Sequence, residues 1–286
     1  MRIRVSQQMT YRYAPGAKSL IQTLRLTPRN TESQFVVNWR IDVDVDGRLR
    51  PVEDAFANLT HVLSVAGPVE QVTVNVQGTV ETFDSAGVVR GAVERFPESL
   101  YLRDTPLTEA GEAVQAFAEE ATAAGQDDRL ARMHLLMAAI HQRFDYDASE
   151  NRTALSAAET LSRGAGACQD FAHLFIAAAR HLSVPARYVS GYVWRGEPGS
   201  KERGGGDAGH AWAEAHIAGL GWVAFDPANK ICPAGAHVRV AAGLDQLGAA
   251  PVRGAQYGGG EERMEVRVAV DALEPSQSQS QSQSQS

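Results

Sequence analysis

The feature that most constrains this fold is a glycine turn followed by a long apolar pattern in residues 164–182. The turn comes first, at residues 164–166, so Cys168 falls in the first turn of the helix that the pattern predicts. The apolar residues recur at spacings of three and four, as on one buried helix face: Phe171, Leu174, Phe175, Ala178 and Leu182. The chain therefore presents a cysteine at the start of a helix.

A cysteine in this place has two interpretations. The unpaired backbone N–H groups and the positive end of the helix dipole favour a thiolate, the nucleophilic form of the side chain. Unbridged cysteines are also among the most buried residues and often act as small apolar side chains. Considered alone, Cys168 fits the second interpretation better, so a catalytic role requires a partner base elsewhere in the chain.

A candidate base lies in a predicted β-hairpin. Residues 210–217 and 222–226 have the pattern of two short strands around a glycine-containing turn. If the midpoint is residue 218, His210 and Asp226 lie opposite each other on one face, about 5 Å apart between Cβ atoms. An imidazole that binds a carboxylate on one side and faces a thiol on the other is an arrangement of nucleophilic catalysis. Each residue alone has an ordinary structural explanation, and the shared register is what joins them.

The same blocks carry a resemblance to a known family. Segments 166–173, 184–191, 210–214 and 221–229, in this order, resemble the bacterial transglutaminase-like family. The resemblance covers nearly the whole chain, because the first third is similar to the β-rich domain that precedes the core in that family. It implies an α+β, papain-like core, preceded by an all-β, sandwich-like domain. The triad that it implies consists of Cys168, His210 and Asp226.

Strands are predicted over most of residues 1–98. Apolar and polar residues alternate in segments such as 35–45 and 69–80, and turn-forming dipeptides separate these segments. A period of two with one polar face is typical of antiparallel sheets packed on one side. The block at residues 54–58, Asp-Ala-Phe-Ala-Asn, resembles a family block that usually has glycine in place of Ala57, and we predict a structural role in a turn.

Helical spacing predicts the elements between these strands and the cysteine. An alanine-rich helix is expected over residues 109–124, and a second apolar stripe runs through residues 130–144. A capping box at residues 156–159 opens a third, short helix. Helices before the nucleophile and strands after it predict an α+β core.

The pattern divides the chain into three expected parts, a β domain (1–98), a catalytic core (99–274) and a tail (275–286). The strands after Asp226, ending with residues 264–270, are expected to close the core. From residue 276 the tail alternates serine and glutamine with no apolar residue, so we expect it to be disordered.

Other residues near the cysteine are candidates for supporting roles. Backbone N–H groups at the helix start are natural donors to an oxyanion, and Gln169, Trp212 and Trp194 are candidate side-chain donors. Asp170 is a candidate for a supporting hydrogen bond. His173 lies five residues after the cysteine, about 140° around the helix, so we predict a structural role and a bond to a backbone carbonyl.

No cofactor or metal ion is expected. A zinc site built from Cys168, His210 and Cys232 matches no common ligand spacing, and no acidic loop has the spacing of a calcium site. Residues 204–209 spell G-x-G-x-x-G, but a strand follows them, whereas a dinucleotide site needs a helix. We expect the polar loop that contains them, residues 195–209, to form a mobile flap over the site.

Charge and composition exclude some classes of protein. A net charge of −7 argues against a nucleic-acid-binding face. The amino-terminal sequence lacks the apolar region of a secretion signal, and no run approaches 18 apolar residues, so we expect a cytoplasmic protein that does not span a membrane. With only two cysteines, a disulfide framework is not expected.

The chemistry that follows is double displacement through a thioester on Cys168. The expected substrate is a peptide or protein that carries glutamine or another amide. Transfer to an amine gives a transglutaminase, and transfer to water gives a cysteine protease, amidase or deamidase; the sequence does not separate these outcomes. The family usually has Gly-Arg-Asp-Tyr where this chain has Gly-Leu-Asp-Gln at residues 243–246, so substrate preference need not transfer.

Two other classes of function stay open. A binding module on the same fold would tolerate change at the three candidate residues. Thiol–disulfide exchange would need a second cysteine close to the first, and Cys232 lies far from Cys168 along the chain. The oligomeric state is not predicted.

Overall fold

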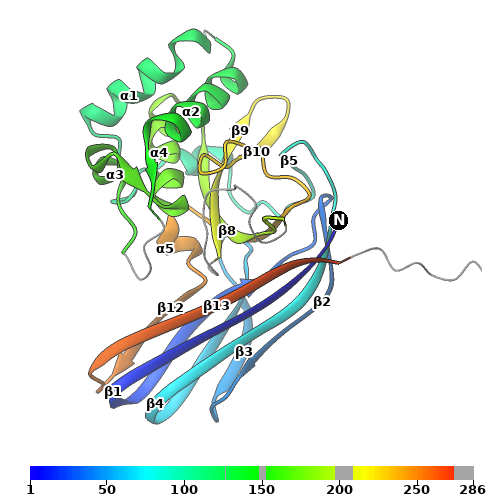
Figure 1. Cartoon of the computed structure of the whole chain (residues 1–286), viewed down its shortest axis with the longest axis vertical. Helices are drawn as coiled ribbons and strands as arrows, with labels where there is room; N and C mark the ends of the chain where they lie inside the picture. Colours follow the sequence, from blue (N-terminus) through cyan, green and yellow to red (C-terminus); the bar gives the residue numbers. More distant parts are fainter. Residues whose placement is uncertain (126, 148–152, 197–208, 274–286) are drawn as a thin grey trace, which may run out of the picture.

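The computed structural model describes residues 1–125, 127–147, 153–196 and 209–273. A sheet of long strands forms one part of the molecule, and a mixed core of helices and strands lies against one end of it (Figure 1). The α+β class and the strand-rich N-terminal part are therefore confirmed. Most of the predicted flap and all of the predicted tail lie outside the described residues.

Six antiparallel strands build the long sheet: β1 (Arg2–Thr27), β2 (Gln34–Val43), β3 (Arg48–Glu53), β4 (Leu59–Thr82), β12 (Val252–Tyr257) and β13 (Glu261–Leu273). We call this sheet the N-terminal sheet. Its two longest strands, β1 and β4, pair along almost their whole length. The first half of β1 also pairs with β13, and its second half pairs with β12.

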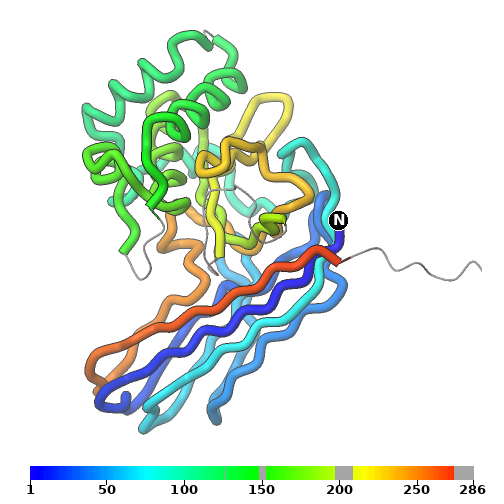
Figure 2. The backbone as a smooth tube through the Cα atoms, viewed as in Figure 1, coloured from blue at the N-terminus to red at the C-terminus, as the bar shows by residue number. Residues whose placement is uncertain are grey.

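The N-terminal sheet bends across its middle. The register of β1 on β4 shifts between Arg12 and Ser19, and apolar residues from both halves of the two strands pack into one core. Examples are Met9 and Leu20 from β1, and Leu63 from β4. The bend lets the sheet close over its own apolar face, which is the sandwich-like arrangement that the alternating pattern predicted. Figure 2 shows the long strands running side by side toward this bend.

The last two strands correct the sequence prediction, which placed them in the core. Residues 252–257 and 261–273 instead pair with β1. They cover an edge of β1 that would otherwise expose unpaired backbone groups. Their alternating pattern predicted strands correctly, but alternation does not show which sheet a strand joins.

The core has a five-stranded sheet in the order β11-β8-β9-β10-β5, which we call the core sheet. Its strands are β5 (Val88–Val89), β8 (Ala186–Val193), β9 (His210–Ile217), β10 (Gly221–Phe225) and β11 (His237–Gly243). A separate parallel pair, β6 (Asp145–Tyr146) and β7 (Ala165–Gly166), precedes the helix that carries the cysteine.

Helices cover one side of the core sheet. They are α1 (Glu112–Thr122), η2 (Ala123–Gly125), α2 (Arg129–Arg143), α3 (Ala157–Arg163), α4 (Cys168–His181) and α5 (Gln246–Ala249), whereas η1 (Glu98–Leu102) packs Tyr101 against Trp222 of β10. Helix α4 is buried over almost its whole circumference, although its apolar stripe predicted one buried face. The reason is its position between β9 and the layer formed by α1, α2 and α3.

None of the helices in the described ranges is both long and apolar enough to cross a membrane. The cytoplasmic location expected from the sequence stays a prediction.

Two amide side chains join the N-terminal sheet to strand β11, which lies at the edge of the core sheet. The Gln34 amide donates to the carbonyl of Arg239 and accepts from its N–H, both at 2.8 Å. Asn58 makes the same pair of bonds with Ala242, also at 2.8 Å. These amides satisfy backbone groups that a neighbouring strand would otherwise bind.

The predicted turn at residues 54–58 orients one of these amides. Asp54 accepts hydrogen bonds from the backbone N–H groups of Phe56 and Asn58 and from the Asn58 amide, each at 3.0 Å. Ala57 has a φ of 62°, a left-handed conformation that glycine adopts at lower cost. The structural role predicted for this block is confirmed.

We predict that Glu214 is essential for stability. Its fully buried carboxylate receives Arg187 at 2.7 Å and Arg239 at 2.8 Å. Because Glu214→Ala leaves both guanidinium groups without this carboxylate, it should lower the free energy of unfolding by roughly 3–5 kcal/mol, measured by urea denaturation. The exposed pair Glu120–Arg143 provides the control, and Glu120→Ala should change stability very little. Equal effects of the two changes would contradict this prediction.

Candidate active site

Asp170 and Gly166 determine where helix α4 begins. One carboxylate oxygen of Asp170 accepts the N–H of Ala167, and the other accepts the N–H of Leu155, both at 2.8 Å. A Cβ atom on residue 166 would lie 2.9 Å from the Cβ of Asp170, so glycine is required there. Asp170 thus fixes the loop that delivers Cys168, the first residue of the helix.

Cys168 is 7% exposed and packs in the apolar core that contains α4, with polar side chains reaching its sulfur. Its Sγ donates to Oε1 of Gln169 at 3.4 Å. The hydroxyl of Tyr146 also interacts with this thiol. Burial, and then the charge of Cys168, raise the pKa of Tyr146. Gln169 was predicted as a candidate donor at this site, whereas Tyr146 was not predicted, because it reaches the site through the pairing of β6 with β7.

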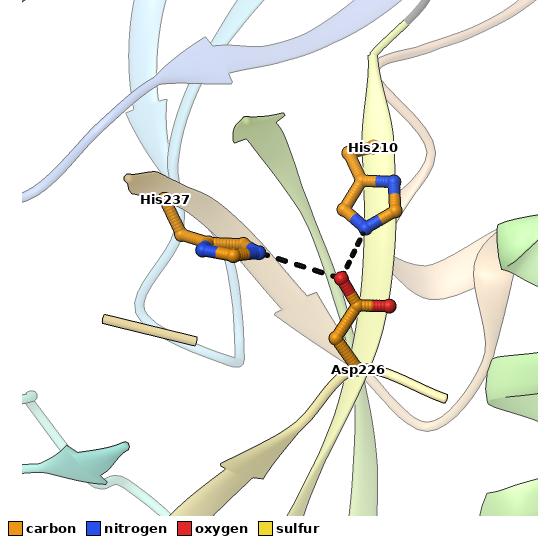
Figure 3. Close-up of side chains that lie close together, drawn as sticks. All are labelled: His210, Asp226 and His237. Carbon is orange, nitrogen blue, oxygen red and sulfur yellow. Dashed lines mark hydrogen bonds and ion pairs between the residues drawn. The ribbon is translucent and has the colours of Figure 1, made fainter. Parts of the chain in front are cut away.

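His210 and Asp226 form a fully buried pair. Nε2 of His210 donates to Oδ2 of Asp226 at 2.7 Å (Figure 3). His210 is the first residue of β9, and Asp226 directly follows β10. The hairpin therefore brings the two predicted residues together, as expected.

The register of this hairpin differs from the predicted one by two residues. Phe225 pairs with Ala213, so Asp226 comes opposite Trp212 rather than opposite His210. Positive φ angles at Gly219 and Gly221 place the centre of the turn at residue 219. Because a shift of two residues keeps every side chain on its face, His210 and Asp226 become diagonal neighbours and still meet.

Asp226 accepts further hydrogen bonds from residues that the sequence analysis missed. Oδ2 also receives the Asn229 amide at 2.8 Å and Nε2 of His237 at 3.4 Å. Oδ1 receives the backbone N–H groups of Ala228 and Asn229 at 3.1 and 3.3 Å. Asn229 follows Asp226 in the same tight turn, so turn chemistry could have identified it. His237 comes from β11, and no local pattern connects it with Asp226.

The electrostatics of the pair favour two charged groups. Burial lowers the pKa of His210, but Asp226 and then Cys168 outweigh this effect and raise it to about 10. Burial raises the pKa of Asp226, and His210 and His237 together bring it well below its ordinary value. An imidazolium is therefore held beside a carboxylate that stays ionised.

The second ring nitrogen of His210 is free to act on the thiol. Nδ1 lies on the side of the ring away from Asp226 (Figure 3) and has no hydrogen-bond partner among the described residues. Cys168 interacts with this imidazole strongly enough to raise its pKa. The three residues predicted from the sequence thus lie together in the order thiol, imidazole, carboxylate.

Trp212 packs behind this pair. It shares a face of β9 with His210, whereas the intervening Ala211 belongs to the apolar core that contains α4. Its ring lies 5.4 Å from that of His237, and its buried Nε1 has no partner in the described part of the chain. This placement favours a role in shielding the imidazole from water, and donation to an oxyanion by Trp212 or Trp194 stays a prediction.

His173 has the structural role predicted for it. Its Nδ1 bonds the carbonyl of Leu155 at 2.9 Å, and its Nε2 accepts the N–H of Gln246 at 3.1 Å. Both ring nitrogens are used, so this histidine ties helix α4 to the loop before α3 and to α5.

Three ligand-type atoms at the site lie within 4.8 Å of one another, on His210, Asp226 and His237. Since a carboxylate only accepts, both imidazoles donate an Nε2 proton to Oδ2, and a metal ion would have to displace both protons. The arrangement therefore fits hydrogen bonding to Asp226 better than metal binding. Cys232 lies elsewhere, against Gly87.

Comparison with known proteins shows which family and which fold this chain shares. Residues 115–227 match the model of the transglutaminase-like superfamily, and residues 3–81 match the bacterial transglutaminase-like N-terminal region. The chain belongs to the transglutaminase-like superfamily. The first match contains three of the four blocks on which the resemblance was based and most of the fourth, and the second match lies in the strand-rich first third of the chain.

Relatives of this transglutaminase-like chain extend over nearly its whole length. An uncharacterized protein of Mycobacterium leprae, ML0607, is 27% identical over 95% of this chain and 99% of its own length. Another from Mycobacterium tuberculosis, Rv2569c, is 28% identical over 95% and 92%. A solved candidate cysteine protease of Cytophaga hutchinsonii superposes with a TM-score of 0.76 at 21% identity, covering 96% of this chain and 91% of that one. This last similarity shows that the whole two-part fold is shared.

We predict that the contribution of His210 to the stability of the fold is lost as the pH rises into the alkaline range. Folding raises the pKa of His210 from 6.5 to about 10. Such a group stabilises the fold fully at pH values below its pKa in the unfolded chain. This contribution is lost as the pH rises through its pKa in the folded protein. The melting temperature of the wild type should therefore fall more between pH 7 and 10 than that of His210→Gln. Parallel curves for the two proteins would contradict the buried imidazolium.

Proposed function

We propose that this protein is a cysteine-dependent acyl-transfer enzyme that acts on a carboxamide or peptide carbonyl. The observation that supports it most is the buried His210–Asp226 pair, whose other imidazole nitrogen is free beside the thiol of Cys168. A thiol, a base and a group that orients the base are the minimum set for nucleophilic catalysis. A binding module would not need to bury an ion pair behind a cysteine.

In the proposed reaction the sulfur of Cys168 attacks the carbonyl carbon. A tetrahedral oxyanion forms and collapses to a thioester, while His210 gives its proton to the departing amine or ammonia. Asp226 holds the imidazole in the tautomer and orientation that this transfer needs. An amine or water then attacks the thioester, His210 takes the proton of the attacking group, and the thiolate is released.

The oxyanion would be stabilised at the start of helix α4. Its first N–H groups are not used by the helix itself and lie beside the thiol. Tyr146 adds a side-chain donor that the sequence did not reveal, because its raised pKa keeps the hydroxyl protonated next to Cys168. The Gln169 amide is a further candidate, with its Oε1 already at the sulfur.

The acceptor decides between two enzyme classes. An amine acceptor would make the protein a transglutaminase-like acyltransferase, and a water acceptor would make it a protease, amidase or deamidase. The substrate in either case is a peptide or protein that carries a glutamine or another amide. The low exposure of the sulfur favours substrates that reach it with a slender side chain or an extended backbone.

Mass spectrometry of a glutamine-containing peptide, with and without a primary amine, tests this function. We expect either incorporation of the amine, a gain of about one mass unit, or a cleaved peptide bond, depending on the acceptor. Cys168→Ser should lower the rate by at least about a thousandfold, since the nucleophile is lost. The matched control is Cys232→Ser, which should retain activity. A panel of peptides and amides left unchanged by the wild type would contradict the proposal.

A further inference from the structure

His237 is a second imidazole on the carboxylate of Asp226. Its Nε2 donates to Oδ2 at 3.4 Å, and its ring centre lies 6.0 Å from that of His210. It comes from β11, which β8 and β9 separate from β10 in the core sheet. With 6% exposure, His237 approaches Oδ2 of Asp226 from a different direction than His210 (Figure 3).

A buried carboxylate needs such donors. Asp226 has no exposed surface, so ionisation there costs free energy that hydrogen bonds must offset. His210 supplies one donor to Oδ2 through Nε2, while its other nitrogen, Nδ1, exchanges the proton during catalysis. Asn229 and His237 supply two further donors to Oδ2, from residues that take no part in the proton transfer.

The N-terminal sheet holds the backbone on both sides of His237. Two residues before it, the hydroxyl of Thr82 donates to the carbonyl of Gly235. Two residues after it, the Gln34 amide binds both backbone groups of Arg239. The position of His237 over the site is therefore set in part by β2 and β4, which belong to the other part of the fold.

The remaining charged groups near His237 are already paired. Glu214 and Arg239 line a shallow cleft with it, and they bind each other at 2.8 Å. Its other nitrogen, Nδ1, is buried and has no partner among the described residues. Asp226 is thus the group toward which the polar side of His237 is directed.

We propose that His237 is a positioning residue for the Asp226–His210 pair, and that the N-terminal sheet aligns the active site by holding the strand that carries it. The proposal rests on the function proposed above, and it assigns a catalytic purpose to the contact between the two parts of the chain. His237 acts through Asp226 and does not touch the reacting atoms.

The rate at which iodoacetamide alkylates Cys168, followed by mass spectrometry between pH 5 and 9, tests this role without a known substrate. In the wild type, His210 in its charged form should keep Cys168 reactive at pH 6. Removal of one donor to Asp226 in His237→Leu should lower the rate at pH 6 by about threefold to tenfold, and His237→Gln, which keeps an amide donor, should recover most of it.

Two comparisons separate the possible failures. Cys232 in the same sample is an internal reference, because burial raises the pKa of its thiol. A wild-type Cys168 that reacts at pH 6 no faster than Cys232 would contradict the proposed function itself. If Cys168 of the wild type is reactive at pH 6 and His237→Leu shows the same dependence of alkylation rate on pH, only the role of His237 is overturned. His216→Leu, at the far end of β9, is the matched control and should resemble the wild type.

A double-mutant cycle tests the contribution of the N-terminal sheet. Gln34→Ala removes the amide that holds β11, so it should slow alkylation at pH 6 by about twofold to fivefold in the wild type and have no effect in His237→Leu. Gln22→Ala removes a buried glutamine of the same sheet that has no hydrogen bond to β11 and should leave the rate unchanged. Equal effects of Gln34→Ala in both backgrounds would overturn the proposal, provided that thermal unfolding shows all variants folded.

Discussion

The structure depends on keeping one ionised carboxylate out of water. Asp226 is fully buried, and five donors among the described residues offset the cost of its charge. Three of them, the backbone N–H groups of Ala228 and Asn229 and the side-chain amide of Asn229, belong to the tight turn after β10, and the imidazoles of His210 and His237 come from β9 and β11. The hairpin, the turn and the edge strand of the core sheet therefore all contact Oδ2 of Asp226. Their arrangement sets the position of the His210 imidazole beside the thiol of Cys168.

The sequence predicted those parts of the site that depend on local periodicity. Cys168 could be placed at a helix start because the apolar stripe and the glycine turn are adjacent, and His210 shares a face with Asp226 because alternation survives a register shift of two. The exact register could not be predicted, since two glycines in the turn allowed more than one centre. Tyr146 and His237 were missed because each reaches the site through pairing with a strand distant in sequence.

The same distinction applies to the fold. Alternation identified the strands at residues 252–273, but whether they complete the core or cover β1 depends on which edge is open, and that is a property of the assembled sheets. Strand β11 shows how closely the two parts are joined, because amides from the N-terminal sheet replace a neighbouring strand along its edge. The part of the chain that precedes the core in sequence thus helps to hold the core sheet beside the active site.

The most direct test of the central claim is the titration of His210 itself, by NMR of protein with ¹⁵N-labelled histidine, assigned with His210→Gln. The buried ion pair predicts that the His210 ring stays protonated well above neutral pH, with a pKa near the value of about 10 given by the structure. It also predicts that Cys168→Ser lowers this pKa, because the thiolate contributes to it. A ring that titrates near 6.5 in the wild type, and equally in Cys168→Ser, would contradict a thiol, imidazole and carboxylate acting together.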